Sequence, residues 1–145
     1  MSNNKTIEIM NNLITTIALV FLTSISCIAQ ETATLKITVP NATSDTGKMM
    51  IGVYTQETFM KAAPVYAANV VIIDGVATAI FENVPTGDYA VNIFHDKNEN
   101  GRMDFENGRP AEAYGLSNNS MSMGPPTWGD ATFLLKENTE LTIRL

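Results

Sequence analysis

After residue 30, apolar and polar side chains alternate with a period of two in short runs that turn residues separate. Residues 35–39 (LKITV) show the pattern clearly, and Pro40-Asn41 ends that run. Successive side chains of a β-strand point to opposite faces of its sheet, so this alternation predicts strands with one buried face. We therefore expect an all-β protein.

Seven runs of this kind, with closely spaced turns, predict an antiparallel seven-stranded β-sandwich of Ig-like or transthyretin-like type. Asp74-Gly75 separates the third and fourth runs and is a strong hairpin signal, because both turn positions favour positive φ. Only residues 56–63 have helical character, and Pro64 limits that helix to two turns. One long loop region follows the fifth run. The runs cover residues 35–39, 48–54, 69–73, 76–81, 88–95, 131–135 and 139–145.

Residues 1–29 do not share the alternation. Lys5 precedes an apolar run over residues 13–22, and small residues then lead to Ala29. A basic start, a short apolar stretch and a small-residue exit predict a secretory signal peptide that is cleaved after Ala29. The run is shorter than the roughly 20 residues of a bilayer-spanning helix, so no transmembrane helix is expected. Residues 30–145 would then form a single extracytoplasmic domain, periplasmic or secreted.

Two alternatives for residues 1–29 stay open. The apolar run could form a buried N-terminal helix of the domain. Cys27 could instead be the lipidated first residue of a lipoprotein, although Ser24-Ile25-Ser26 matches such a signal poorly.

Composition narrows the classes of function. The chain has a formal net charge of −6, one His and one Cys. A phosphate backbone needs clustered Lys and Arg, so no nucleic-acid partner is expected. A single His and a single Cys exclude a His- or Cys-rich metal cage, a disulfide framework and a CxxC redox pair.

An oxygen-rich segment after the fifth run resembles an EF-hand-type calcium loop. Asp96, Asn98 and Asn100, followed by Gly101, reproduce its D-x-[DN]-x-[DN]-G start. Alternate residues there turn oxygen atoms towards a hard cation, and the glycine allows the sharp turn. The predicted calcium ligands are Asp96, Asn98, Asn100, Arg102 through its backbone carbonyl, Asp104 at the ninth position and Asn107 at the twelfth.

The twelfth position departs from the pattern. A bidentate Glu belongs there, whereas the chain has Asn107, with Glu106 one place early. Without flanking helices, the segment is more similar to the loop-only calcium sites of dockerin and thrombospondin-type repeats. With few charged ligands we expect weak affinity, about 10⁻⁴–10⁻³ M. A polar loop rich in Asx turns that holds no ion is the alternative.

His95 ends the fifth run on its inward face, where we expect it to be half-buried at the edge of the sheet. Asp96 points to the opposite face, so the two cannot form a dyad within the strand. A structural role that ties the loop to the domain is therefore favoured. The alternative is a small extracytoplasmic hydrolase in which His95 acts with Asp104, Glu106 or Glu112.

Residues 108–128 show little strand pattern, and long irregular loops are commonly functional or mobile. Tyr114, Asn118 and Trp128 are predicted to form a surface for a glycan or a partner protein at the cell envelope. Alternatively, the aromatic side chains cap the open end of the sandwich. Met121 and Met123, with His95, would suit soft Cu(I), a minor alternative.

Motifs between residues 81 and 128 resemble those of a bacterial secreted family, domain of unknown function 2141. They are F-E-N-V-P-x-G-x-Y-A-V, H-D-x-N-x-N-G-x-x-D, P-x-E-x-Y-G-x-S-N-N and G-P-P. Within the first, Pro85-x-Gly87-x-Tyr89 is similar to the turn and core strand of transthyretin-like, carboxypeptidase-regulatory-type domains. The resemblance implies an extracytoplasmic domain with no established activity.

A transthyretin-like fold also occurs in hydroxyisourate hydrolases, which use several His residues and a Tyr-Arg-Gly-Ser ending. This chain has one His and ends in Thr142-Ile143-Arg144-Leu145, so that resemblance fails at the site. The sequence therefore favours an exported, non-enzymatic module whose calcium loop orders an adjacent ligand- or partner-binding segment.

Overall fold

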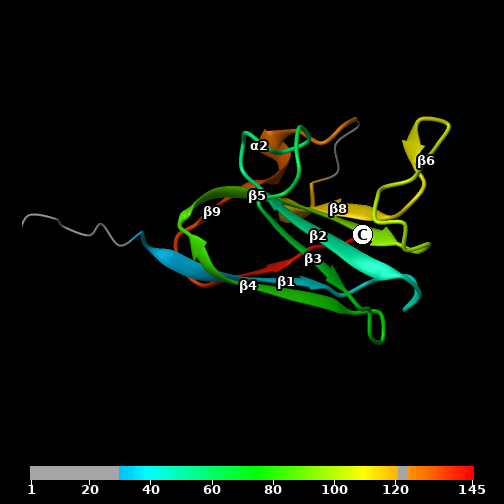
Figure 1. The fold of residues 1–145 in the computed structure, drawn as a ribbon, viewed down its shortest axis with the longest axis horizontal. Helices are drawn as coiled ribbons and strands as arrows, with labels where there is room; N and C mark the ends of the chain where they lie inside the picture. Colours follow the sequence, from blue (N-terminus) through cyan, green and yellow to red (C-terminus); the bar gives the residue numbers. More distant parts are fainter. Residues whose placement is uncertain (1–29, 121–123) are drawn as a thin grey trace, which may run out of the picture. The chain divides into compact units, whose positions relative to one another are not determined.

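The computed structural model describes residues 30–120 and 124–145 (Figure 1). By its contacts, Glu31–Leu145 forms one compact unit. The predicted signal peptide, the Cys27 alternative and the Met121–Met123 copper alternative lie outside the described residues. Within the described part, no helix is long and apolar enough to cross a membrane.

The prediction of an all-β protein is confirmed, with strands in several open sheets. The largest sheet has the order β3-β2-β5-β8, and β9 also pairs with β5. The second has the order β10-β1-β4, and β6 and β7 form a separate hairpin. The strands of the first sheet are β2 (Lys48–Tyr54), β3 (Tyr66–Val70), β5 (Gly87–Asp96), β8 (Tyr114–Leu116) and β9 (Thr132–Leu135). Those of the others are β1 (Thr32–Val39), β4 (Ala77–Pro85), β10 (Thr139–Thr142), β6 (Phe105–Glu106) and β7 (Arg109–Pro110).

The sheet arrangement differs in part from the predicted antiparallel seven-stranded sandwich. β10 pairs with β1 in parallel, with Leu35 opposite Thr139. Residues 136–138 do not form a hairpin, because they carry the chain from β9 in one sheet to β10 in the other. Alternation indicates which face of a strand is buried, but it does not identify the neighbouring strand.

Two local predictions also need correction. Residues 56–63 form successive turns and no regular helix, and Met60 adopts a positive φ of 56°. The third strand is Tyr66–Val70, not residues 69–73. Asp74-Gly75 does form a tight turn with positive φ at both residues, bridged by Ile73 and Val76.

Two hydrophobic clusters lie on the two faces of the five-stranded sheet. The larger combines side chains of both main sheets, including Leu35, Val91 and Ile93, which are fully buried. In β5 the residues between these inward ones face outward. There Ala90 belongs to a second cluster with Phe59, which α2 (Trp128–Ala131) helps to cover (Figure 1).

His95 is fully buried, not half-buried as expected. It is the penultimate residue of β5, which pairs with β2 on one side and with β8 and β9 on the other. At His95 itself, Met49 of β2 lies on one side, and the Ala113 carbonyl on the other side accepts a hydrogen bond from the His95 backbone N. The end of the strand is therefore covered on both sides.

Candidate functional site

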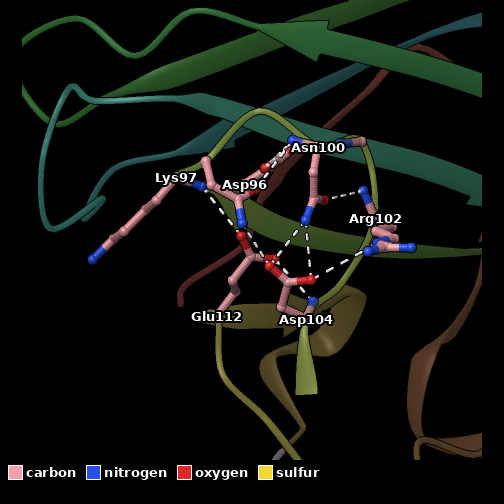
Figure 2. Close-up of polar contacts among 8 residues, drawn as sticks. Asp96, Lys97, Asn100, Arg102, Asp104 and Glu112 are labelled. Atoms are coloured by element: carbon pink, nitrogen blue, oxygen red, sulfur yellow. Dashed lines mark hydrogen bonds and ion pairs between the residues drawn. The ribbon is translucent and has the colours of Figure 1, made fainter. Parts of the chain in front are cut away.

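Asp96 is the last residue of β5 and the first residue of the oxygen-rich loop. This carboxylate is buried, with 1% of the residue exposed, and it accepts hydrogen bonds from two backbone amides of the same loop. The donors are Asn100 N at 3.2 Å and Gly101 N at 2.7 Å. Gly101 has a positive φ of 78°, which lets the chain curl back over the carboxylate (Figure 2).

Gly47, between β1 and β2, lies directly against the start of this loop. Its φ is +81°, and a Cβ there would come within 2.2 Å of the Asp96 carbonyl oxygen and 2.7 Å of Lys97 Cα. Only glycine permits this approach of two backbone segments. Two segments therefore hold the end of β5 in place: the loop that follows it in the sequence and the distant segment around Gly47.

Asn98 and Asn100 each close an Asx turn. Asn98 Oδ1 accepts a hydrogen bond from Asn100 N, and Asn100 Oδ1 accepts one from Arg102 N, both at 3.0 Å. Their amide nitrogens point to Asp104 instead. Asn98 Nδ2 donates to Asp104 Oδ2 at 2.6 Å, and Asn100 Nδ2 lies 3.0 Å from both Asp104 oxygens.

These amide donors hold the pKa of Asp104 below its ordinary value of 3.8. The hydrogen bond from Asn100 has the largest effect, followed by that from Asn98, and the positive charge of Arg102 adds to them. Arg102 Nε is 3.9 Å from Asp104 Oδ1, a long ion pair on an exposed side chain. Hydrogen bonds to the ionised form, more than the ion pair, thus stabilise this carboxylate.

Glu112 reaches back to the loop from outside it, as Figure 2 shows. Its Oε1 accepts a hydrogen bond from Lys97 N at 3.2 Å, and its Oε2 accepts one from Asp104 N at 3.4 Å. One carboxylate therefore links the second and the ninth positions of the loop. From the sequence, Glu112 is expected only as a partner of His95 in the alternative hydrolase.

Asn107 does not join the other predicted ligands. With Gly108 it forms the two-residue turn between β6 and β7, with φ of 49° and 76°. This turn reverses the chain, so that Ala111 N donates to the Asp104 carbonyl at 2.8 Å and Glu112 returns to the loop. Asn-Gly is a strong hairpin signal. Asn107 was instead predicted to be a ligand because it occupies the twelfth position of the calcium-loop pattern.

Within the described residues, no group of three His, Cys, Asp or Glu side chains has the arrangement of a metal site. The carboxylates of the loop accept hydrogen bonds from its own donors, since Asp96 faces backbone amides and the nitrogens of Asn98 and Asn100 face Asp104. A cation would repel those N–H groups and attract the amide oxygens. Binding would therefore require both amide groups to turn.

His95 connects the end of β5 to two other segments of the chain. Its Nε2 donates to the Thr46 carbonyl at 2.7 Å, and its backbone N donates to the Ala113 carbonyl at 2.9 Å. In the described part of the chain, Nδ1 is buried without a hydrogen-bond partner, and no carboxylate bonds to the ring. A buried ring of this kind has no access to a substrate.

Tyr114, Asn118 and Trp128 do not form one surface. Tyr114 lies in β8 and is 38% exposed. Trp128 packs edge-on against Phe59, with ring centroids 5.9 Å apart, in the second cluster. Asn118 donates to the carbonyls of Asp130 and Thr132 and so fixes the end of α2.

The fold and this loop define an open-sheet all-β protein with a polar, carboxylate-lined loop at the end of its central strand. The chain belongs to the family described as "Uncharacterized protein conserved in bacteria (DUF2141)", whose model matches residues 37–143. No curated protein matches the chain, and no solved structure matches it. The family description names no activity.

Proposed function

We propose that the protein is an exported, non-enzymatic β-sandwich module in which the loop beginning at Asp96 binds Ca²⁺ and orders the adjoining binding segment. Asp96, Asn98, Asn100, the Arg102 carbonyl and Asp104 are the proposed ligands. Glu112 replaces Asn107 in this set.

The position of Glu112 carries this proposal. An EF-hand-type loop needs a carboxylate that closes it from the far end, and the loop itself offers none at the twelfth position. Glu112 lies outside the loop in the sequence, but the fold brings its carboxylate into contact with Lys97 and Asp104. It can therefore take the place of the missing glutamate. The β6–β7 hairpin lies between Asp104 and Glu112, so an ion held by both residues would also fix the hairpin.

A calorimetric titration tests the calcium site. We expect chelator-stripped protein to bind Ca²⁺ with a dissociation constant of about 10⁻⁴–10⁻³ M, as extracellular modules do. Glu112→Gln should weaken binding at least tenfold because it removes a charged ligand. Glu106→Gln is the matched control, since Glu106 is exposed in the neighbouring hairpin and should leave binding unchanged. Absence of both heat and a thermal shift at millimolar Ca²⁺ would contradict the proposal.

Export rests on residues 1–29. Mass spectrometry of the mature protein should find an N-terminus at Gln30, after removal of a signal peptide. A diacylated Cys27 would instead make the protein a membrane-anchored lipoprotein, and retention of Met1 would contradict export through this segment.

A further inference from the structure

A groove lies on the outward face of the five-stranded sheet, next to the proposed calcium loop. Its volume is about 880 Å³, which is within the range of pockets for small molecules. Outward-facing residues of the sheet form its floor, and residues of the β6–β7 hairpin and residues 124–126 form its walls. The lining residues used below are Tyr54, Asn92, Phe94, Phe105, Arg109 and Tyr114.

Glycine at position 52 shapes the floor of this groove. Gly52 lies opposite Asn92 in the pairing of β2 with β5. A Cβ on Gly52 would come within 2.7 Å of the Tyr54 ring, so that ring lies across the space that a side chain would fill. Phe94 is opposite Tyr114 in the pairing of β5 with β8. The floor is therefore mainly aromatic.

One buried polar atom interrupts the aromatic floor. Asn92 Oδ1 is buried and has no hydrogen-bond partner within the described residues. Buried acceptors are nearly always paired in folded proteins, so this oxygen requires an explanation. Asn92 also lines the groove, so a ligand that brings an N–H or O–H group against it would supply the missing donor once the amide turns its oxygen towards the groove.

A cation lies at the rim. Arg109 is exposed in β7, and no ion pair forms at its guanidinium among the residues that the structure describes. A guanidinium at the mouth of an apolar groove favours a ligand with an anionic group at one end.

We propose that this groove binds a small, planar, apolar molecule that carries an N–H or O–H donor for Asn92 and an anionic group for Arg109. The proposal names the ligand class for the binding role in the proposed function and does not depend on calcium.

A pair of fluorescent probes tests the proposed ligand class, because the two probes share an apolar body and an anionic group but differ at the N–H donor. The fluorescent dye 2-anilinonaphthalene-6-sulfonate has a planar apolar body, an N–H donor and a distant sulfonate. Its N-methyl analogue carries N–CH₃ in place of N–H and so cannot donate this hydrogen bond. We expect saturable one-to-one binding of both, with the N–H probe binding about tenfold more tightly, the order expected for one buried hydrogen bond. A thermal shift upward with the probe would show that it binds the folded protein.

Variants then assign the contacts. Asn92→Leu should equalise the affinities for the two probes, and Arg109→Gln should weaken both probes equally. Val71→Ala, an exposed apolar position elsewhere on the domain, should change neither. Absence of saturable binding, equal affinities in the unmodified protein, or a preference that persists in Asn92→Leu would overturn the proposal. Should Asn92→Leu not fold, an unchanged affinity in Arg109→Gln would overturn the proposed anionic contact.

The measurements are made in chelator and again in millimolar Ca²⁺. Probe binding in chelator supports the groove even if calorimetry finds no calcium site. Calcium binding without probe binding would overturn the groove and leave the calcium proposal standing.

Discussion

At the scale of single residues, the carboxylates of Asp96, Asp104 and Glu112 organise the loop through different donors. Asp96 accepts backbone amides of the loop, Asp104 accepts side-chain amides, and Glu112 accepts the amides of Lys97 and Asp104. For Asp104, the side-chain amide donors stabilise the ionised form of the carboxylate and lower its pKa. The loop should therefore depend on pH in the acidic range.

The first prediction concerns the pKa of Asp104. Because this pKa is lowered in the folded protein, its hydrogen bonds stabilise the fold fully above pH 3.8 and are lost as the pH falls through the lowered value. Asn100→Ala removes the largest cause and should raise the Asp104 pKa towards 3.8. Carboxyl ¹³C NMR titration measures both values. Asn69→Ala, at an exposed position of β3 away from the loop, is the control. An equal Asp104 pKa in the unmodified protein and in Asn100→Ala would contradict this explanation of the lowered pKa.

At the scale of elements, β5 connects every part of the candidate site. Its inward residues enter the core, its outward residues form the floor of the groove, and its last residue begins the loop. Ser117, in the short 3₁₀ helix η1 (Ser117–Asn119), fastens β5 to α2. Its buried Oγ accepts a hydrogen bond from Val91 N at 2.9 Å and donates one to the Ala131 carbonyl.

Ser117→Ala tests this connection. The substitution leaves the buried Val91 N–H without an acceptor, and we expect the free energy of unfolding to fall by about 1–3 kcal/mol. Urea denaturation measures the loss. Thr43→Ala is the comparison, because Thr43 is exposed in a loop and water can replace any hydrogen bond of its hydroxyl. Equal losses in the two variants would show that burial of Ser117 has no special effect.

The sequence predicts an element well when the residues that determine it are close together in the chain, and poorly when they are far apart. The strand at residues 48–54 was predicted from alternation alone, and the structure has the same bounds. Parallel pairing of β1 with β10 joins distant segments and leaves no local pattern. For the site, the start of the loop was recognisable, whereas the contact of Glu112 with Asp104 depends on the Asn107-Gly108 turn and was missed.

At the scale of the whole described domain, the loop and the groove share one segment. Met103 and Phe105 line the groove, and Asp104 between them belongs to the loop. Glu112 holds the other end of the β6–β7 hairpin to the same loop. An ion bound between Asp104 and Glu112 would therefore fix one wall of the groove.

A crystal structure of the protein grown in millimolar Ca²⁺ would show whether the loop that begins at Asp96 holds an ion. The account predicts an ion within 2.3–2.6 Å of oxygen atoms from Asp96, Asp104 and Glu112, roughly the normal range for Ca²⁺. The amide oxygens of Asn98 and Asn100 should have turned towards it. An empty loop, with both amide nitrogens still bonded to Asp104 at saturating Ca²⁺, would contradict the account.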